Sequence, residues 1–120
     1  MGNFCDAAVI ADLKGSEPKL HYHPQYYYMG HFSKFLKEGA KRVKSAVDGV
    51  EGMGQGDCSW PYGKCNGDVL HSTAWEVDGE LVVVVLNCGD DDKQIELEVG
   101  GVEGVVRNKV AAHTIQTYVM

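Results

Sequence analysis

The apolar positions in the first third of the chain repeat with the period of an α-helix. Four of them follow the spacing i, i+4, i+7 and i+8, namely Tyr28, Phe32, Phe35 and Leu36. Pro24 suits the first turn of a helix, where its missing N–H is not needed. Gly39 suits the left-handed residue that ends one. The pattern predicts a helix over 24–38, preceded by a short strand over 7–11.

Beyond residue 68 the period changes to the alternation of β-strands. Every second position of 69–77 forms one predicted face, made of Val69, His71, Thr73, Trp75 and Val77. Asp78-Gly79 is a strong signal for a two-residue hairpin. The next segment, 81–86, is apolar at every position, as in a central strand covered on both faces. Two further alternating segments, 95–99 and 113–119, complete this part.

These elements predict a mainly β protein with two regions. Residues 39–120 are expected to form an antiparallel β-sandwich of short strands, including a weaker strand at 41–47. Residues 48–68 are rich in glycine and are expected to form an irregular loop. The strand and helix of 1–38 do not fit the sandwich and resemble the end of another structure.

Composition and charge exclude several classes of protein. The chain has 11 basic and 17 acidic residues and a net charge of −6, which argues against binding nucleic acid through its phosphates. Its longest strictly apolar run, from Leu81 to Leu86, is too short to span a bilayer. The first residues lack the basic and apolar regions of a secretory signal.

Two groups of residues could carry covalent or metal chemistry. Cys58 and Cys65 could form a local disulfide, or remain two free thiols. His21, His23 and His31 could hold a metal ion, but no second pair of ligands lies at a suitable spacing. A polar surface is the favoured interpretation of these histidines, so neither a metal nor a cofactor is predicted.

The pattern of residues along the sequence does not identify an active site. Four glutamates on predicted strands could act as acid or base, namely Glu76, Glu80, Glu96 and Glu98. None has the apolar surroundings that would raise a carboxyl pKa, so we expect a solvated surface. Aromatic residues instead crowd the predicted helix, between Tyr22 and Phe35. Because they point in more than one direction, they indicate a further domain or partner that covers them.

One block of residues is specific enough to indicate a family. The sequence from Tyr28 to Phe35, Tyr-Met-Gly-His-Phe-Ser-Lys-Phe, resembles the end of the catalytic barrel in glycoside hydrolase family 30, the glucosylceramidase group. The resemblance continues in Asn3-Phe4, in the segment 82–87 and in 113–118, and covers 3–47 and 69–119. The loop 48–68 departs from the family pattern and looks like an insertion.

The resemblance implies a fold, a parent activity and a set of partners. It implies the family's C-terminal β-sandwich over 39–120, preceded over 1–38 by the last strand and helix of a (β/α)8 barrel. That helix would dock on the barrel through Tyr28, His31, Phe32 and Phe35. The parent reaction would be the retaining hydrolysis of glucosylceramide, a glycosphingolipid presented at a membrane surface, in a lysosomal or secreted enzyme.

The resemblance also implies what is missing. Both catalytic glutamates of the family lie upstream of the residues matched here, so no catalytic residue is assigned. Only Asn3 and Phe4 correspond to the rim of the substrate pocket. We therefore expect a supporting role and no activity from this chain alone. Two alternatives remain: a carbohydrate-binding module with Trp60, Tyr62 or Trp75 as a platform, and a subunit that docks on a separate barrel.

Overall fold

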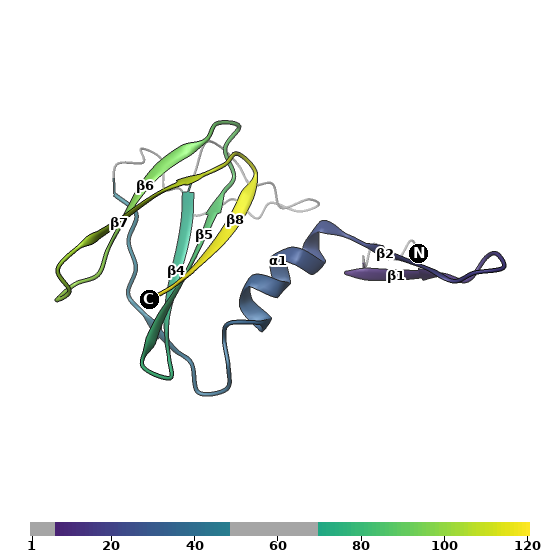
Figure 1. Ribbon diagram of the computed structural model, residues 1–120, viewed down its shortest axis with the longest axis horizontal. Helices are drawn as coiled ribbons and strands as arrows, with labels where there is room; N and C mark the ends of the chain where they lie inside the picture. Colours follow the sequence, from purple (N-terminus) through teal and green to yellow (C-terminus); the bar gives the residue numbers. More distant parts are fainter. Residues whose placement is uncertain (1–6, 49–69) are drawn as a thin grey trace, which may run out of the picture. The chain divides into compact units, whose positions relative to one another are not determined.

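A computed structural model describes residues 7–48 and 70–120. These residues belong to two compact units, Met1–Phe35 and Leu36–Met120. The first contains β1 (Val9–Asp12), β2 (Lys19–Tyr22) and α1 (Pro24–Ser33). The second contains β3 (Lys41–Val43), β4 (Leu70–Val77), β5 (Glu80–Asn87), β6 (Lys93–Glu98), β7 (Val105–Val110) and β8 (Thr114–Val119). The predicted mainly β class is confirmed (Figure 1).

The first unit is an antiparallel hairpin followed by a helix. Strand β1 pairs with β2, a strand that the apolar pattern did not predict, with Val9 opposite Tyr22. The N–H of His23 then donates to the Ala8 carbonyl at 3.0 Å and closes the end of this ladder. Pro24 occupies the first turn of α1, as predicted.

The helix is shorter than the predicted span of 24–38, and that part of the prediction is wrong. It ends at Ser33, where Lys34 donates to the Gly30 carbonyl. Phe35 then donates to the Phe32 carbonyl at 3.2 Å, a tighter turn that ends the α-helical pattern. Gly39 does adopt the left-handed conformation, with φ +87°, but in the turn that leads to β3.

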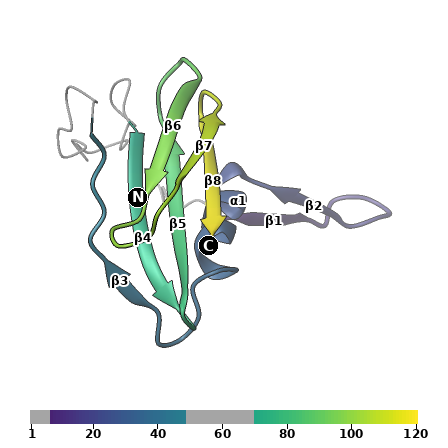
Figure 2. The same cartoon turned by 60° about the vertical axis from the view of Figure 1, so that its left-hand side comes forward.

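The second unit is a sandwich of two antiparallel sheets. One sheet has the order β3-β4-β5-β8 and the other is the hairpin β6-β7. Figure 2 shows this hairpin lying across one face of β4 and β5. The predicted central strand is confirmed, because β5 pairs with β4 on one side and β8 on the other.

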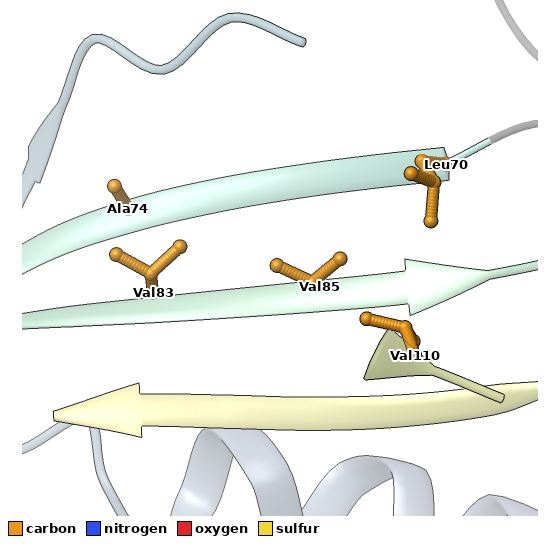
Figure 3. Packing of buried hydrophobic residues seen from close by; sticks show 5 residues of the cluster. All are labelled: Leu70, Ala74, Val83, Val85 and Val110. Atoms are coloured by element: carbon orange, nitrogen blue, oxygen red, sulfur yellow. The ribbon is translucent and has the colours of Figure 1, made fainter. Parts of the chain in front are cut away.

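The core lies between the two sheets. Figure 3 shows Val83 and Val85 projecting from one face of β5 beside Leu70 and Ala74 of β4. Val110 of β7 closes the cluster and is completely buried. Partly buried side chains pack against it from both sheets and from the segment after β3, namely Val43, Val47, Leu81, Ile95, Leu97 and Tyr118.

The buried residues of β4 show which of its two faces meets the second sheet. The predicted face from His71 to Trp75 is not the one that packs in this core. Leu70 and Ala74, on the opposite face, are the residues that pack against Val83 and Val85. Alternation identified the two faces but could not decide which one meets the second sheet.

Turns in this unit follow the local sequence. Asp78 and Gly79 both have positive φ, 53° and 86°, as the two central residues of a type I′ hairpin require. Lys37 approaches the Asp78 carboxylate at 3.0 Å and joins the segment before β3 to this turn. The hydrogen bond and charge of Asp78 raise the pKa of Lys37. Both side chains are exposed, so the pair adds little stability.

Candidate docking surface

The predicted docking helix presents most of its side chains to solvent. No residue of α1 is buried. Of the predicted docking residues, Phe32 is exposed, whereas Tyr28, His31 and Phe35 are half-buried. A short helix with no buried side chain lacks the packing from which most helices in proteins gain stability.

Three tyrosines form the densest part of this surface. The rings of Tyr22 and Tyr26 lie 4.9 Å apart in an edge-to-face arrangement, and those of Tyr26 and Tyr27 lie 5.4 Å apart. All three are exposed, Tyr27 by 60%. With each aromatic side chain able to bury about 150–250 Å², half-exposed rings in this group leave on the order of 300 Å² of aromatic surface.

Further apolar side chains in the same unit enlarge the exposed area. Met29, also on α1, is 61% exposed. The β1–β2 hairpin adds exposed Ile10, Leu13 and Leu20. The largest apolar patch on a typical monomer measures about 300–600 Å². We define the docking surface as the exposed side chains Ile10, Leu13, Leu20, Tyr22, Tyr26, Tyr27, Met29 and Phe32.

Sequence reasoning found the aromatic part of this surface but missed the hairpin residues. Leu13 and Leu20 flank a turn rich in polar residues, and their segments show no amphipathic period. The signal that could have found them is the pairing of β1 with β2, which the structure supplies.

Four other predicted site residues lie outside the described residues, namely Asn3, Phe4, Cys58 and Cys65. Their predicted roles stay predictions. Within 7–48 and 70–120, no group of three or more His, Cys, Asp or Glu residues could hold a metal ion.

The four glutamates considered as catalytic candidates are all exposed. Glu96 accepts a hydrogen bond from Arg107 Nε at 2.7 Å across the β6–β7 hairpin. This hydrogen bond and the charge of Glu96 raise the pKa of Arg107. Glu96 is thus engaged in an exposed ion pair, typical of a strand surface.

Trp75 does not offer an open aromatic platform. The residue is half-buried, and its indole Nε1 is buried without a hydrogen-bond partner among the residues described. A sugar-binding tryptophan would present its ring to solvent. The other two aromatic residues suggested for such a platform, Trp60 and Tyr62, lie outside the described part of the chain.

A polar clamp holds one end of the sandwich. Asn87, the last residue of β5, is completely buried. Its Nδ2 donates to the carbonyls of Asp91 at 2.8 Å and of Val110 and Ala111 at 3.1 Å. Its Oδ1 accepts from the Gly89 N–H at 2.9 Å. We call this set of hydrogen bonds the Asn87 clamp; it joins the β5–β6 and β7–β8 connections.

Ion pairs surround the clamp at the surface. Lys109 approaches Asp92 at 2.7 Å, and the Ala112 N–H donates to the same carboxylate at 3.1 Å. These two hydrogen bonds, with the charge of Lys109, lower the pKa of Asp92. His113 Nε2 lies 2.9 Å from Asp90. These exposed contacts add to the Asn87 clamp in linking the β5–β6 connection to the residues around the β7–β8 connection.

Comparison with known proteins identifies the class to which this sandwich belongs. The model of the glycosyl hydrolase family 30 beta sandwich domain matches residues 39–118. The chain therefore belongs to glycoside hydrolase family 30, through its β-sandwich domain.

Similarity to one relative extends across both units. The chain is 28% identical over 116 residues to the lysosomal acid glucosylceramidase of Mus musculus. This alignment covers 97% of the chain but only 19% of the mouse protein. No solved structure gives a significant match.

No helix in the described parts of the chain is long and apolar enough to cross a membrane.

Proposed function

We propose that this chain is the C-terminal segment of a glucosylceramidase-like retaining β-glycosidase. The parent reaction is the hydrolysis of glucosylceramide to glucose and ceramide. The single observation that carries the proposal is the family match over 39–118, extended by an alignment that covers 97% of the chain. A lysosomal location of the parent enzyme agrees with the mouse relative.

The role proposed for the chain itself is structural. Family members use two catalytic glutamates, which lie upstream of the part of the family that this chain resembles. The four glutamates considered above, in this chain, are exposed. The sandwich has a packed core and a clamped end, both features of a supporting domain. We therefore expect no hydrolysis by the chain alone.

The partner proposed for the docking surface is the catalytic (β/α)8 barrel. Exposed aromatic surface of this extent favours association, because burying apolar area is worth about 25 cal/mol per Å². On that scale the three contacting tyrosines alone, at roughly 300 Å², would contribute several kcal/mol before the costs of association.

A replacement experiment tests this function. The matching stretch of mouse glucosylceramidase would be exchanged for this chain, and hydrolysis of a fluorogenic β-glucoside and of glucosylceramide in vesicles would be measured. We expect activity from the chimera and none from the isolated chain. A matched chimera carrying Tyr26→Ser and Tyr27→Ser should lose activity while its sandwich stays folded.

Three outcomes would contradict the proposal in different parts. Turnover by the purified chain alone would refute the supporting role. A folded chimera that binds glucosylceramide but is inactive would refute the equivalence with the family domain. Unchanged activity in the tyrosine variant would refute the barrel-docking role of these side chains.

A further inference from the structure

The turn end of the β1–β2 hairpin presents two leucine side chains to solvent. Strand pairing places Leu20 opposite Ala11, and both residues are exposed. Leu13, which follows β1 directly, is 75% exposed, and Leu20 is 57% exposed. We call residues 13–20, which contain both leucines, the hairpin tip.

The hairpin tip lies away from the tyrosines of the docking surface. The ring of Tyr22 contacts that of Tyr26 at the base of the hairpin, where Tyr22 pairs with Val9. The ladder continues from Val9 to Asp12, a length of about 10 Å at the usual rise of a β-strand. Figure 1 shows the hairpin projecting from the N-terminal end of α1, with its turn at the far end. A partner that covers the tyrosines therefore does not have to cover the leucines.

The place of the hairpin before α1 indicates the end of the barrel to which it belongs. In a (β/α)8 barrel, the C-terminal ends of the strands and the N-terminal ends of the helices lie at the same end, where the loops between them build the active site. Strand β2 ends at Tyr22 and α1 begins at Pro24. With α1 as the last helix of the barrel, as the proposed function requires, the hairpin belongs to the loop that precedes this helix at the catalytic end.

We propose that the hairpin tip contacts the lipid bilayer that holds the glucosylceramide substrate; this inference rests on the proposed function. Glucosylceramide stays in the bilayer through its hydrocarbon chains, so the catalytic end of the barrel has to reach the membrane surface. Exposed leucines at this end supply apolar area that enters the boundary between lipid headgroups and acyl chains. The docking surface is then divided between two partners, with the tyrosines on the barrel and Leu13 and Leu20 on the bilayer.

The charges of the hairpin tip favour a bilayer over a protein partner at this position. Each leucine has an exposed lysine as its neighbour in the sequence, namely Lys14 and Lys19. A protein surface that buried the leucines would also take these ammonium groups out of water, and lysine is almost never fully buried in proteins. At a bilayer, lysine keeps its charge among the headgroups while its apolar neighbours enter the acyl region. Together with Glu17, the lysines give the tip a net charge of 2 − 1 = +1, whereas the whole chain has −6.

The test uses the chimera of mouse glucosylceramidase and this chain with two substrates, a water-soluble fluorogenic β-glucoside and glucosylceramide in vesicles of phosphatidylcholine and phosphatidylserine. In the variant that combines Leu13→Ser with Leu20→Thr, we expect the ratio of vesicle activity to soluble activity to fall at least about tenfold, because burying a leucine side chain changes a binding constant by about this factor or more. The partition of the chimera into the same vesicles, measured by flotation, should fall by a similar factor. The matched control is Val102→Ser, which removes an apolar side chain that is 65% exposed in the other unit and should change neither measurement.

Different results separate this inference from the proposed function. An equal loss of activity on both substrates would place the leucines against the barrel and overturn the inference. Unchanged vesicle binding with an unchanged activity ratio in the leucine variant would overturn it as well. A folded chimera that is inactive on both substrates would instead contradict the proposed function, and flotation of that chimera and of its leucine variant would still decide whether the tip contacts a bilayer.

Discussion

Replacing Asn87 by alanine should destabilise the sandwich severely, because this one buried amide satisfies four backbone groups. The substitution removes acceptance from the Gly89 N–H and donation to the carbonyls of Asp91, Val110 and Ala111. The bonds to Gly89 and Val110 are buried. Leaving a buried backbone group unsatisfied costs about 1–3 kcal/mol.

Two such groups together cost about 2–6 kcal/mol of a total stability of roughly 5–15 kcal/mol. In a domain of this size about 1 kcal/mol shifts the melting temperature by 4–8 °C. We therefore expect Asn87→Ala to lower the melting temperature by at least about 8 °C. Asn87→Asp should be at least as harmful, since a carboxylate oxygen would face the three carbonyls that the amide Nδ2 now satisfies.

The assay is thermal unfolding followed by circular dichroism, with Asn108→Ala as the matched control. Asn108 is exposed on β7, where its Nδ2 donates to the Tyr118 hydroxyl at 3.3 Å, and its removal should cost less than about 1 kcal/mol. Equal melting temperatures for Asn87→Ala and Asn108→Ala would refute the argument that the buried amide stabilises this end of the sandwich.

Three further predictions concern the core, the docking surface and acid stability. Val84→Asp, at a position 3% exposed on central β5, should abolish folding, because an unpaired buried carboxylate costs several kcal/mol; a cooperative melt like that of the natural chain would argue against this. The isolated chain should self-associate in size-exclusion chromatography with light scattering, and Tyr27→Ser with Met29→Ser should reduce this association, whereas Val102→Ser, an exposed control, should not. Asp92 has a pKa below its ordinary value of 3.8, so its pair with Lys109 stabilises the fold above that pH and is lost as the pH falls through the folded pKa. The difference in melting temperature between the natural chain and Asp92→Asn should therefore be small but present at pH 7, and should shrink as the pH falls below 3.8; a difference that grows on acidification would contradict the sign.

The local sequence was sufficient to predict those features that depend only on residues close together in the chain. The unbroken apolar segment 81–86 could only be a strand covered on both faces, and β5 is central. Asp78-Gly79 tolerates positive φ at both positions, so the hairpin followed from the two residue types. The block from Tyr28 to Phe35 was specific enough to indicate the family without a fold.

Tertiary structure decided the features that depend on what lies opposite a residue. Which face of β4 meets the second sheet became known only from the packing of Leu70 and Ala74 in the cluster that includes Val110 of β7. Strands β2 and β7 are mostly exposed and carry little apolar alternation, so pairing with β1 and β6 defines them rather than any pattern of their own. Asn87 reads in the sequence as an ordinary turn residue, and its burial follows from three carbonyls that converge on it from two separate connections. Local preferences act over a few neighbouring residues, whereas the hydrogen bonds of Asn87 alone join positions up to 24 apart along the chain, which no short-range pattern encodes.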